Sequence, residues 1–205
     1  MAFSVAKEGF WVSAGTVTLS SLLLATWFNW LGIVIFFFFL FELFFFRDPD
    51  RESKKMEEGN ILSPADGTII SIEDGKISIF MSLFDVHINR APAAGEVEDV
   101  IYQRGGFKVA FHEKAPLENE RNTVILKSRA GTLSLTQVAG VVARRIVCNV
   151  RKGDRLRAGD RIGMIKFGSR VDLQLPIDAK MNVSRGDRVK AGLCSIATVE
   201  RKERS

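Results

Sequence analysis

The feature that most constrains this sequence is an almost uncharged apolar run near its N-terminus. From Trp11 to Phe46 the only formally charged residue is Glu42, and most of the Phe residues of the chain lie at or before Phe46. Asn29 divides the run into halves of about 17 residues, and at about 1.5 Å per residue each half would form a helix of about 26 Å, close to the thickness of a bilayer core. We therefore expect residues 1–46 to form a membrane anchor, a hairpin of two short transmembrane helices.

Two other interpretations of this run are a single long tilted span and a cleaved signal peptide. A signal peptide is disfavoured because the run is too long and lacks a small-residue cleavage site. The segment 47–55 holds four basic residues, so the positive-inside rule places it, and the domain that follows, on the cytoplasmic side of the cell membrane. We expect Glu42 to face the partner helix or the membrane interface, because a carboxylate that faces lipid is costly.

After Lys55 the pattern changes to short alternating runs punctuated by Gly, which predicts a β-rich α+β domain over residues 47–205. One hairpin is expected from Thr68–Ile72 and Lys76–Phe80, because Asp74-Gly75 suits a tight primed turn. A second is expected from Thr123–Leu126 and Thr132–Thr136. A further strand, Val171–Leu175, should stop at Pro176, which lacks the N–H that a ladder needs.

The domain also contains an internal near-repeat. Lys152-Gly-Asp-Arg-Leu-Arg-Ala-Gly159 matches Arg185-Gly-Asp-Arg-Val-Lys-Ala-Gly192 almost position for position. Two copies are too few for a solenoid, so we expect two similar turn corners of one barrel or sandwich. The pattern resembles the corners of lipoyl- and biotinyl-carrier domains, which implies a barrel-like, lipoyl-like sandwich. It also suggests one alternative function, a non-enzymatic membrane-anchored adaptor, although neither copy carries a modifiable Lys beside Met.

Metal and nucleic-acid chemistry have little support in the composition. The chain has two Cys, Cys148 and Cys194, and two His, so we expect reduced core thiols and no metal site. Lys and Arg outnumber Asp and Glu by 29 to 24, an excess that fits a solvated face or anionic lipid headgroups. Nucleic acid is not expected as a partner, because no aromatic and basic stacking motif accompanies the charge.

Three short segments carry polar groups that a plain β domain does not need. They are Leu62-Ser-Pro-Ala-Asp-Gly67, Phe80-Met-Ser-Leu-Phe-Asp-Val-His-Ile-Asn-Arg-Ala-Pro92 and Lys166-Phe-Gly-Ser-Arg170. Taken singly, Asp66 is a turn residue, His87 a structural histidine and Gly168-Ser169 a bulge, although a histidine can also act as a base near neutral pH. A membrane-anchored serine peptidase is another alternative, but no Gly-x-Ser-x-Gly elbow surrounds Ser169.

Together with Glu118-Asn-Glu-Arg-Asn122, these segments occur in an order that resembles the phosphatidylserine decarboxylases. The similarity runs from about Arg47 to Glu200 and is closest to the short form of the family, which includes archaetidylserine decarboxylases. It implies a proenzyme that cleaves itself at Gly168-Ser169 into a large chain 1–168 and a small chain 169–205, which stay associated. Ser169 would become a covalent pyruvoyl group that decarboxylates phosphatidylserine to phosphatidylethanolamine through a Schiff base. Whether the lipid backbone is a diacylglycerol or an archaeal ether stays open.

The resemblance also implies roles for individual residues. Ser169 would supply the pyruvoyl group, Asp66 matches the activating aspartate of the family, and His87 matches the first histidine of its paired-histidine motif. Larger relatives have a second histidine where this chain has Arg90, so the division of proton transfers between His87 and Asp66 stays open. A guanidinium suits phosphate or carboxylate, which makes Arg90 a candidate contact for an anionic group of the substrate. We expect His112 to be structural or on the surface, and Asn119–Asn122 to form a structural loop near the site.

Overall fold

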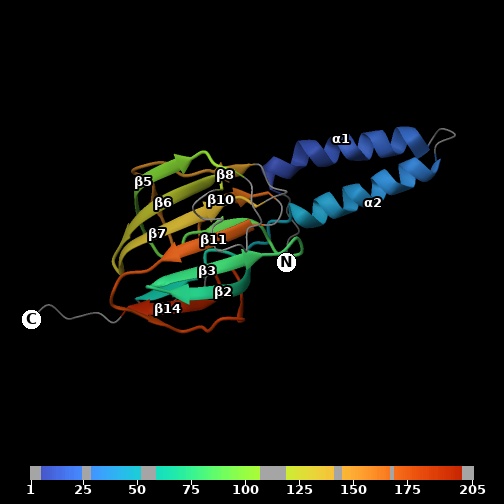
Figure 1. The fold of residues 1–205 in the computed structure, drawn as a ribbon. Helices are drawn as coiled ribbons and strands as arrows, with labels where there is room; N and C mark the ends of the chain where they lie inside the picture. The colour runs from blue at the N-terminus through green and yellow to red at the C-terminus, as the bar shows by residue number, and fades with distance from the viewer. Residues whose placement is uncertain are drawn as a thin grey trace, which may run out of the picture. The chain divides into compact units, whose positions relative to one another are not determined.

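The structure is a computed structural model that describes residues 6–24, 29–51, 59–106, 119–140, 145–166 and 169–199. The chain divides into two compact units, Met1–Asp50 and Arg51–Ser205. The first unit is helical and the second is built from strands (Figure 1). The β-rich α+β class expected from the sequence is therefore confirmed.

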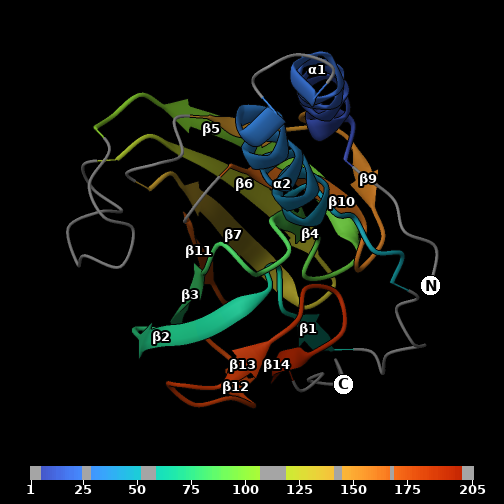
Figure 2. The same cartoon turned by 90° about the vertical axis from the view of Figure 1, so that its right-hand side faces the viewer.

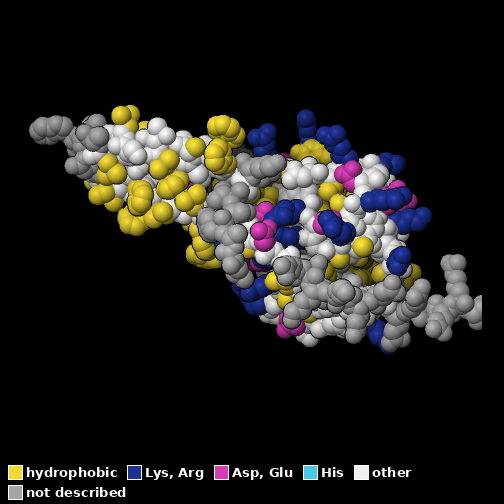
Figure 3. All heavy atoms as spheres, turned by 180° about the vertical axis from the view of Figure 1, so that it is seen from behind, with side chains coloured by type: hydrophobic (Ala, Val, Ile, Leu, Met, Phe, Trp, Pro, Cys, Tyr) yellow, Lys and Arg dark blue, Asp and Glu magenta, His cyan; other side chains and the backbone are white. Residues whose placement is uncertain are grey.

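The helical unit is a hairpin of α1 (Lys7–Leu24) and α2 (Asn29–Phe45). Two hydroxyl groups of α1 reach α2: that of Thr16 donates to Oε2 of Glu42 at 2.6 Å, and that of Ser20 donates to the carbonyl of Gly32 at 2.9 Å. Glu42 is only 3% exposed, which confirms that it faces the partner helix. Apolar side chains cover the outside of this unit (Figure 3).

The helix starts differ from the hydropathy pattern. Helix α1 begins at Lys7, four residues before the apolar run begins at Trp11, and α2 begins at Asn29, one residue before the second apolar half. Residues 25–28, which include part of the expected turn, lie outside the described residues. Neither α1 nor α2, as far as they are described, is both long and apolar enough to cross a membrane.

The described residues of the second unit form three antiparallel sheets (Figures 1 and 2). The largest has the strand order β13-β2-β3-β11-β7-β6-β5-β9, and the two smaller ones have the orders β1-β14-β12 and β4-β10-β8. The strands are β1 (Asn60–Leu62), β2 (Gly67–Glu73), β3 (Lys76–Met81), β4 (Ile88–Arg90), β5 (Gly95–Gln103), β6 (Arg121–Ser128), β7 (Gly131–Val138), β8 (Ile146–Cys148), β9 (Arg155–Leu156), β10 (Arg161–Ile165), β11 (Ser169–Gln174), β12 (Ala179–Met181), β13 (Arg188–Val189) and β14 (Ser195–Val199).

Both expected hairpins are confirmed as β2–β3 and β6–β7. In the first, Asp74 and Gly75 have positive φ values of 49° and 72°, as a type I′ turn requires. Strand β11 ends at Gln174, one residue earlier than expected, and Leu175 instead donates its N–H to the carbonyl of Gly75. The inward side chains of these strands form one core of aliphatic residues, among them Ile69, Ile77, Ile79, Leu133, Leu135, Val171 and Leu173.

The strand orders show an internal two-fold relationship. Exchanging β2 with β5, β3 with β6, β11 with β7 and β13 with β9 converts the large sheet into itself read backwards. The corresponding exchange converts β1-β14-β12 into β4-β10-β8. Bulges occur at matching places, between Ile69 and Ser71 and between Val97 and Asp99. The unit is therefore made of two interlocked halves of the same topology.

The near-repeat forms equivalent corners of these two halves. Gly153 donates its N–H to the carbonyl of Val97, and Gly186 donates to that of Ile69, both at 2.8 Å. Gly159 donates to Ala91 and Gly192 to Ser63, again at 2.8 Å in both cases. The expected pair of corners is confirmed. The segments that receive these bonds form a second repeat, Ser63-Pro-Ala-Asp-Gly-Thr-Ile69 and Ala91-Pro-Ala-Ala-Gly-Glu-Val97, which the sequence analysis missed.

Candidate active site

The strand register brings the three polar segments toward one end of the large sheet. Thr68 lies opposite Phe80, Phe80 opposite Arg170, and Arg170 opposite Val138. Neighbouring strands are about 4.8 Å apart, so the start of β2, the end of β3 and the start of β11 lie within about 10 Å of one another. Asp66 precedes β2 and Ser169 begins β11, so both residues lie at this end.

Ser169 is fully buried and lies directly opposite Met81 in the β3–β11 ladder. Its hydroxyl donates to the Met81 sulfur at 3.4 Å. A thioether is a weak acceptor, so this bond costs little to break when the hydroxyl proton moves to a base. Gly168, the other side of the expected cleavage bond, lies outside the described residues, as does His112.

His87 is also fully buried, and its ring is oriented by the backbone. Nδ1 lies 2.9 Å from the carbonyl oxygen of Asp85, which can only accept, so Nδ1 carries a hydrogen, and Nε2 presents a lone pair whenever the ring is neutral. The carbonyl of His87 accepts from the N–H of Ile165 at 3.4 Å. This bond ties His87 to the end of β10, four residues before Ser169.

Asp85 supports His87 through a tight turn. Its Oδ2 accepts from the Ser82 backbone N–H at 2.8 Å and from the Ser82 hydroxyl at 2.7 Å, while Arg188 donates to Oδ1 at 2.6 Å. The Asp85 carboxylate is therefore committed to holding the loop, and its carbonyl holds the imidazole.

Asp66 is held by an arginine that the sequence analysis did not single out. Nη1 and Nη2 of Arg51 donate to the two carboxylate oxygens at 2.5 and 2.7 Å, and the Ala191 N–H adds a bond of 2.8 Å. Such a bidentate contact is strong and fixes the plane of the carboxylate. The hydrogen bonds described for Asp66 thus lead to Arg51 and Ala191 rather than to Ser169 or His87. The only signal for Arg51 in the sequence was its place in the basic segment 47–55.

The internal repeat shows that the turn itself does not require Asp66. The equivalent position in the second half is Ala94, and the same backbone bonds form around it. The ordinary interpretation of Asp66 as a turn residue therefore does not explain its side chain.

Arg90 and Asn89 point in different directions from the short strand β4, as alternating strand residues do. Nδ2 of Asn89 donates to the Met81 sulfur at 3.7 Å, and Nη1 of Arg90 donates to the carbonyl of Gly159 at 3.0 Å. Asn89 thus shares the sulfur that Ser169 contacts, whereas Arg90 lies on the lining of a separate open pocket.

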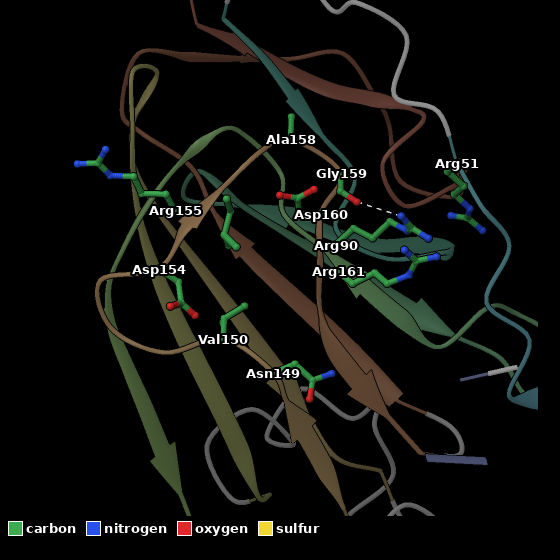
Figure 4. Close-up of a pocket in the computed structure, with 11 residues that line it drawn as sticks. Arg51, Arg90, Asn149, Val150, Asp154, Arg155, Ala158, Gly159, Asp160 and Arg161 are labelled. Atoms are coloured by element: carbon green, nitrogen blue, oxygen red, sulfur yellow. Dashed lines mark hydrogen bonds between the residues drawn. The ribbon is translucent and has the colours of Figure 1, made fainter. Parts of the chain in front are cut away.

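This pocket has a volume of about 520 Å³, and its lining includes Arg51, Arg90, Arg155 and Arg161 (Figure 4). Two carboxylates also line it, but Asp154 accepts from the Arg151 N–H and Asp160 from the Arg157 N–H, each within its own turn. Arg51, Arg90 and Arg161 gather at one side of the pocket (Figure 4). The positive charge there suits an anion.

The comparisons with known proteins agree with this geometry. The family model described as phosphatidylserine decarboxylase matches residues 73–196. The chain belongs to the phosphatidylserine decarboxylase family. It is 41% identical to a phosphatidylserine decarboxylase proenzyme of Magnetococcus marinus over 97% of both chains, and 40% identical to one of Carboxydothermus hydrogenoformans over 95% of this chain and 96% of the relative. A Methanosarcina mazei protein named as an archaetidylserine decarboxylase proenzyme is 47% identical over 76% of this chain and 74% of its own length.

Membership of the phosphatidylserine decarboxylase family confirms the resemblance found in the sequence, and it favours an enzyme over the adaptor and peptidase alternatives. The relatives are named proenzymes, which is consistent with a catalytic group derived from the chain itself. The surroundings of Ser169 fit such a group: the residue is buried, and its hydroxyl is weakly held by Met81.

The structure also bears on the cysteines and on the segment Asn119–Asn122 of this decarboxylase family member. Cys148 and Cys194 were expected within the core, but both are half-buried and pack against it. Asn119 and Asn122 were expected in a loop, but only Asn119 precedes a strand, and Asn122 lies within β6, where it pairs with Gln137. Within the described ranges, no group of three or more His, Cys, Asp or Glu is placed to hold a metal ion.

Proposed function

We propose that this protein is a phosphatidylserine decarboxylase proenzyme that removes the carboxylate of phosphatidylserine to give phosphatidylethanolamine. The observation that carries the proposal is the buried Ser169 at the start of β11, where its hydroxyl contacts Met81. Ser169 also follows β10 by four residues, and the last residue of β10, Ile165, donates its N–H to the carbonyl of His87. Relatives that align over nearly the whole chain carry this name.

We further propose that the chain breaks at Gly168-Ser169 and that Ser169 becomes a covalent pyruvoyl group. Such a group accepts the electron pair that a departing carboxylate leaves behind. The products would be chains 1–168 and 169–205. Their association is supported by the sheet, because β11 of the small chain lies between β3 and β7 of the large chain.

In this proposal His87 is the base that acts through Nε2, since its Nδ1 hydrogen is committed to Asp85. Asp66 is held as an oriented partner of Arg51, and its part is to fix the segment before β2 next to the reacting bond. Arg90 is proposed to contact an anionic group of the substrate together with Arg161, because both side chains line one pocket, whereas the charge of Arg51 is paired with Asp66.

We also propose that the helical hairpin anchors the protein in the cell membrane with the β unit on the cytoplasmic side. The support is the distribution of side chains in the hairpin. Thr16 and Glu42 bond to each other between the helices, whereas large apolar side chains face outward: Trp11, Phe37 and Trp30 are 80%, 64% and 66% exposed. Anchoring would confine the enzyme to the surface where its lipid substrate is presented. Recovery of the protein in an alkaline-washed membrane fraction tests this part, and full release by the wash would refute it.

Intact mass spectrometry of the purified protein tests the main proposal. Two chains are expected, and the shorter should begin with a keto acid in place of serine. The Ser169→Ala variant should remain one inactive polypeptide. Wild-type protein that stays uncut yet releases carbon dioxide from phosphatidylserine would refute the mechanism.

The archaeal ether lipid is a second candidate substrate, favoured by the identity to the Methanosarcina mazei relative. Decarboxylation of diacyl and diether phosphatidylserine analogues in parallel micelle assays distinguishes the two substrates.

A further inference from the structure

A line of buried amide side chains runs through the core toward Ser169. Asn122 on β6, Gln137 on β7 and Asn89 on β4 are 2%, 0% and 0% exposed. Asn122 and Gln137 lie opposite each other in the β6–β7 ladder. Buried amides are costly unless they are hydrogen-bonded, so three of them in one line need a reason.

The hydrogen bonds give this line a direction. Nδ2 of Asn122 donates to Oε1 of Gln137 at 3.0 Å, and Nε2 of Gln137 donates to Oδ1 of Asn89 at 2.8 Å. Since the oxygen of Asn89 is engaged by Gln137, its amino group must point the other way. The line of amides therefore ends on the amino group of Asn89, which is oriented as a donor.

The amino group of Asn89 and the hydroxyl of Ser169 donate to the same acceptor atom. The Met81 sulfur accepts from Nδ2 of Asn89 at 3.7 Å and from Oγ of Ser169 at 3.4 Å. A purely structural network explains why Gln137 binds Asn122 and the Asn89 oxygen. It does not explain why a buried amino group is aimed at a thioether, a weak acceptor. The arrangement makes sense if a stronger acceptor forms beside that sulfur during the reaction.

Such an acceptor forms during self-cleavage, on which this inference rests. When Oγ of Ser169 attacks the carbonyl carbon of Gly168, the new C–O bond replaces the peptide C–N bond. The hydroxyl proton passes through a base to the released nitrogen, so an ester joins the two residues and residue 169 carries a free amino group. A base then removes the Cα proton of residue 169, the Cα–Cβ double bond forms and the Cβ–Oγ bond breaks. The electron pair goes to Oγ, which leaves as one oxygen of the Gly168 carboxylate, and the new end of the small chain takes up water and loses ammonia.

We infer that Asn89 is a catalytic hydrogen-bond donor to Oγ of residue 169 as the Cβ–Oγ bond breaks, and that Gln137 and Asn122 are positioning residues that orient it. Donors fixed in advance and aimed at developing negative charge stabilise a transition state in a buried site. Removing one such donor typically lowers a rate by about 100-fold. The donor acts on the second step of cleavage, so its loss should leave the ester formed but slow to eliminate.

The test follows maturation of Asn89→Ala and Asn89→Asp by intact mass spectrometry, with and without hydroxylamine, which cleaves esters. Relative to wild type, we expect pyruvoyl formation to slow by about 100-fold. Hydroxylamine should release a small chain that still begins with Ser169, heavier than the mature one by the difference between serine and the keto acid. Gln137→Met keeps the volume but leaves Asn89 unoriented, so it should show a smaller delay of the same kind.

Thr136→Val is the matched control. It removes a cross-strand hydroxyl pair, Thr123 with Thr136 at 3.0 Å, from the same β6–β7 ladder one residue from Gln137. It should mature at the wild-type rate. Asn89 variants that mature as fast as wild type would overturn the inference, and so would folded variants that stay uncut without a hydroxylamine-sensitive ester. If Asn89 variants do not fold, Gln137→Met decides, and wild-type maturation in that variant counts against the inference. Failure of wild type itself to cleave would instead refute the proposed function.

Discussion

Arg51 donates through Nη1 and Nη2 to the two carboxylate oxygens of Asp66, at 2.5 and 2.7 Å, and both side chains are nearly buried. Arg51 is the first residue of the β unit, so the beginning of this unit is fastened to the segment that leads into β2. Nη1 of Arg51 also donates to the carbonyl of Ala191 at 2.7 Å, which joins a third segment to the pair.

Loss of Arg51 should therefore destabilise the β unit and slow its maturation. Removing one partner of a buried ion pair leaves an uncompensated charge and costs about 3 kcal/mol of unfolding free energy. We expect a loss of that order in Arg51→Gln, measured by urea denaturation, together with incomplete cleavage on a denaturing gel. Arg51→Gln combined with Asp66→Asn removes the orphaned charge and should regain part of the stability. A double variant no more stable than Arg51→Gln alone would argue against this account.

The arginine-lined pocket predicts a change in substrate binding without a change in maturation. Arg161→Gln should raise KM for phosphatidylserine in mixed micelles by about fivefold, the equivalent of about 1 kcal/mol, and leave kcat and cleavage unaltered. Arg157→Gln is the control, because Arg157 lies on the same corner, is highly exposed and is absent from the pocket lining. Equal KM values for the two variants would show that the pocket does not bind the substrate anion.

A side chain at Gly67, the residue after Asp66, should clash with the neighbouring strand. Its φ is 154°, and a Cβ placed there would lie 2.1 Å from the carbonyl oxygen of Phe80. Gly153 also has a positive φ, 89°, but a Cβ there meets nothing within 4 Å. Gly153→Ala should cost about 1 kcal/mol of unfolding free energy, from backbone strain alone, whereas Gly67→Ala should cost at least about 2 kcal/mol more. Urea midpoints measure both, and equal shifts would contradict the predicted clash.

Tyr102 gives a prediction that optical titration can check, because it is the single tyrosine of the chain. Its pKa is raised above the ordinary value of 10.0 by a hydrogen bond to Glu120 and, to a smaller extent, by burial. The folded phenol thus holds its proton more tightly than the unfolded one. Its contribution to stability is present below the unfolded pKa and is lost as the pH rises through the folded pKa. Glu120→Gln should lower the phenolate midpoint; an unchanged midpoint would exclude Glu120 as the cause.

The sequence by itself determined the features that depend on neighbouring residues. The apolar run predicted a helical hairpin with Glu42 facing the partner helix or the interface, and Asp74-Gly75 predicted the first β-hairpin, because helix formation and tight turns are governed by residues a few positions apart. The ordered motifs singled out Asp66, His87 and Ser169 as candidate site residues, because the family resemblance depends on residue types and their order along the chain.

Only the tertiary structure decided which partners these residues have. Strand β4 is too short to be recognised from an alternating pattern, so the sequence did not reveal that Asn89 shares the Met81 sulfur with Ser169 while Arg90 turns to Gly159. The pairing of Arg51 with Asp66 and the two-fold relationship between the halves depend on ladder registers between distant strands. Register and strand face are fixed by how the whole core is buried, which no local stretch of sequence specifies.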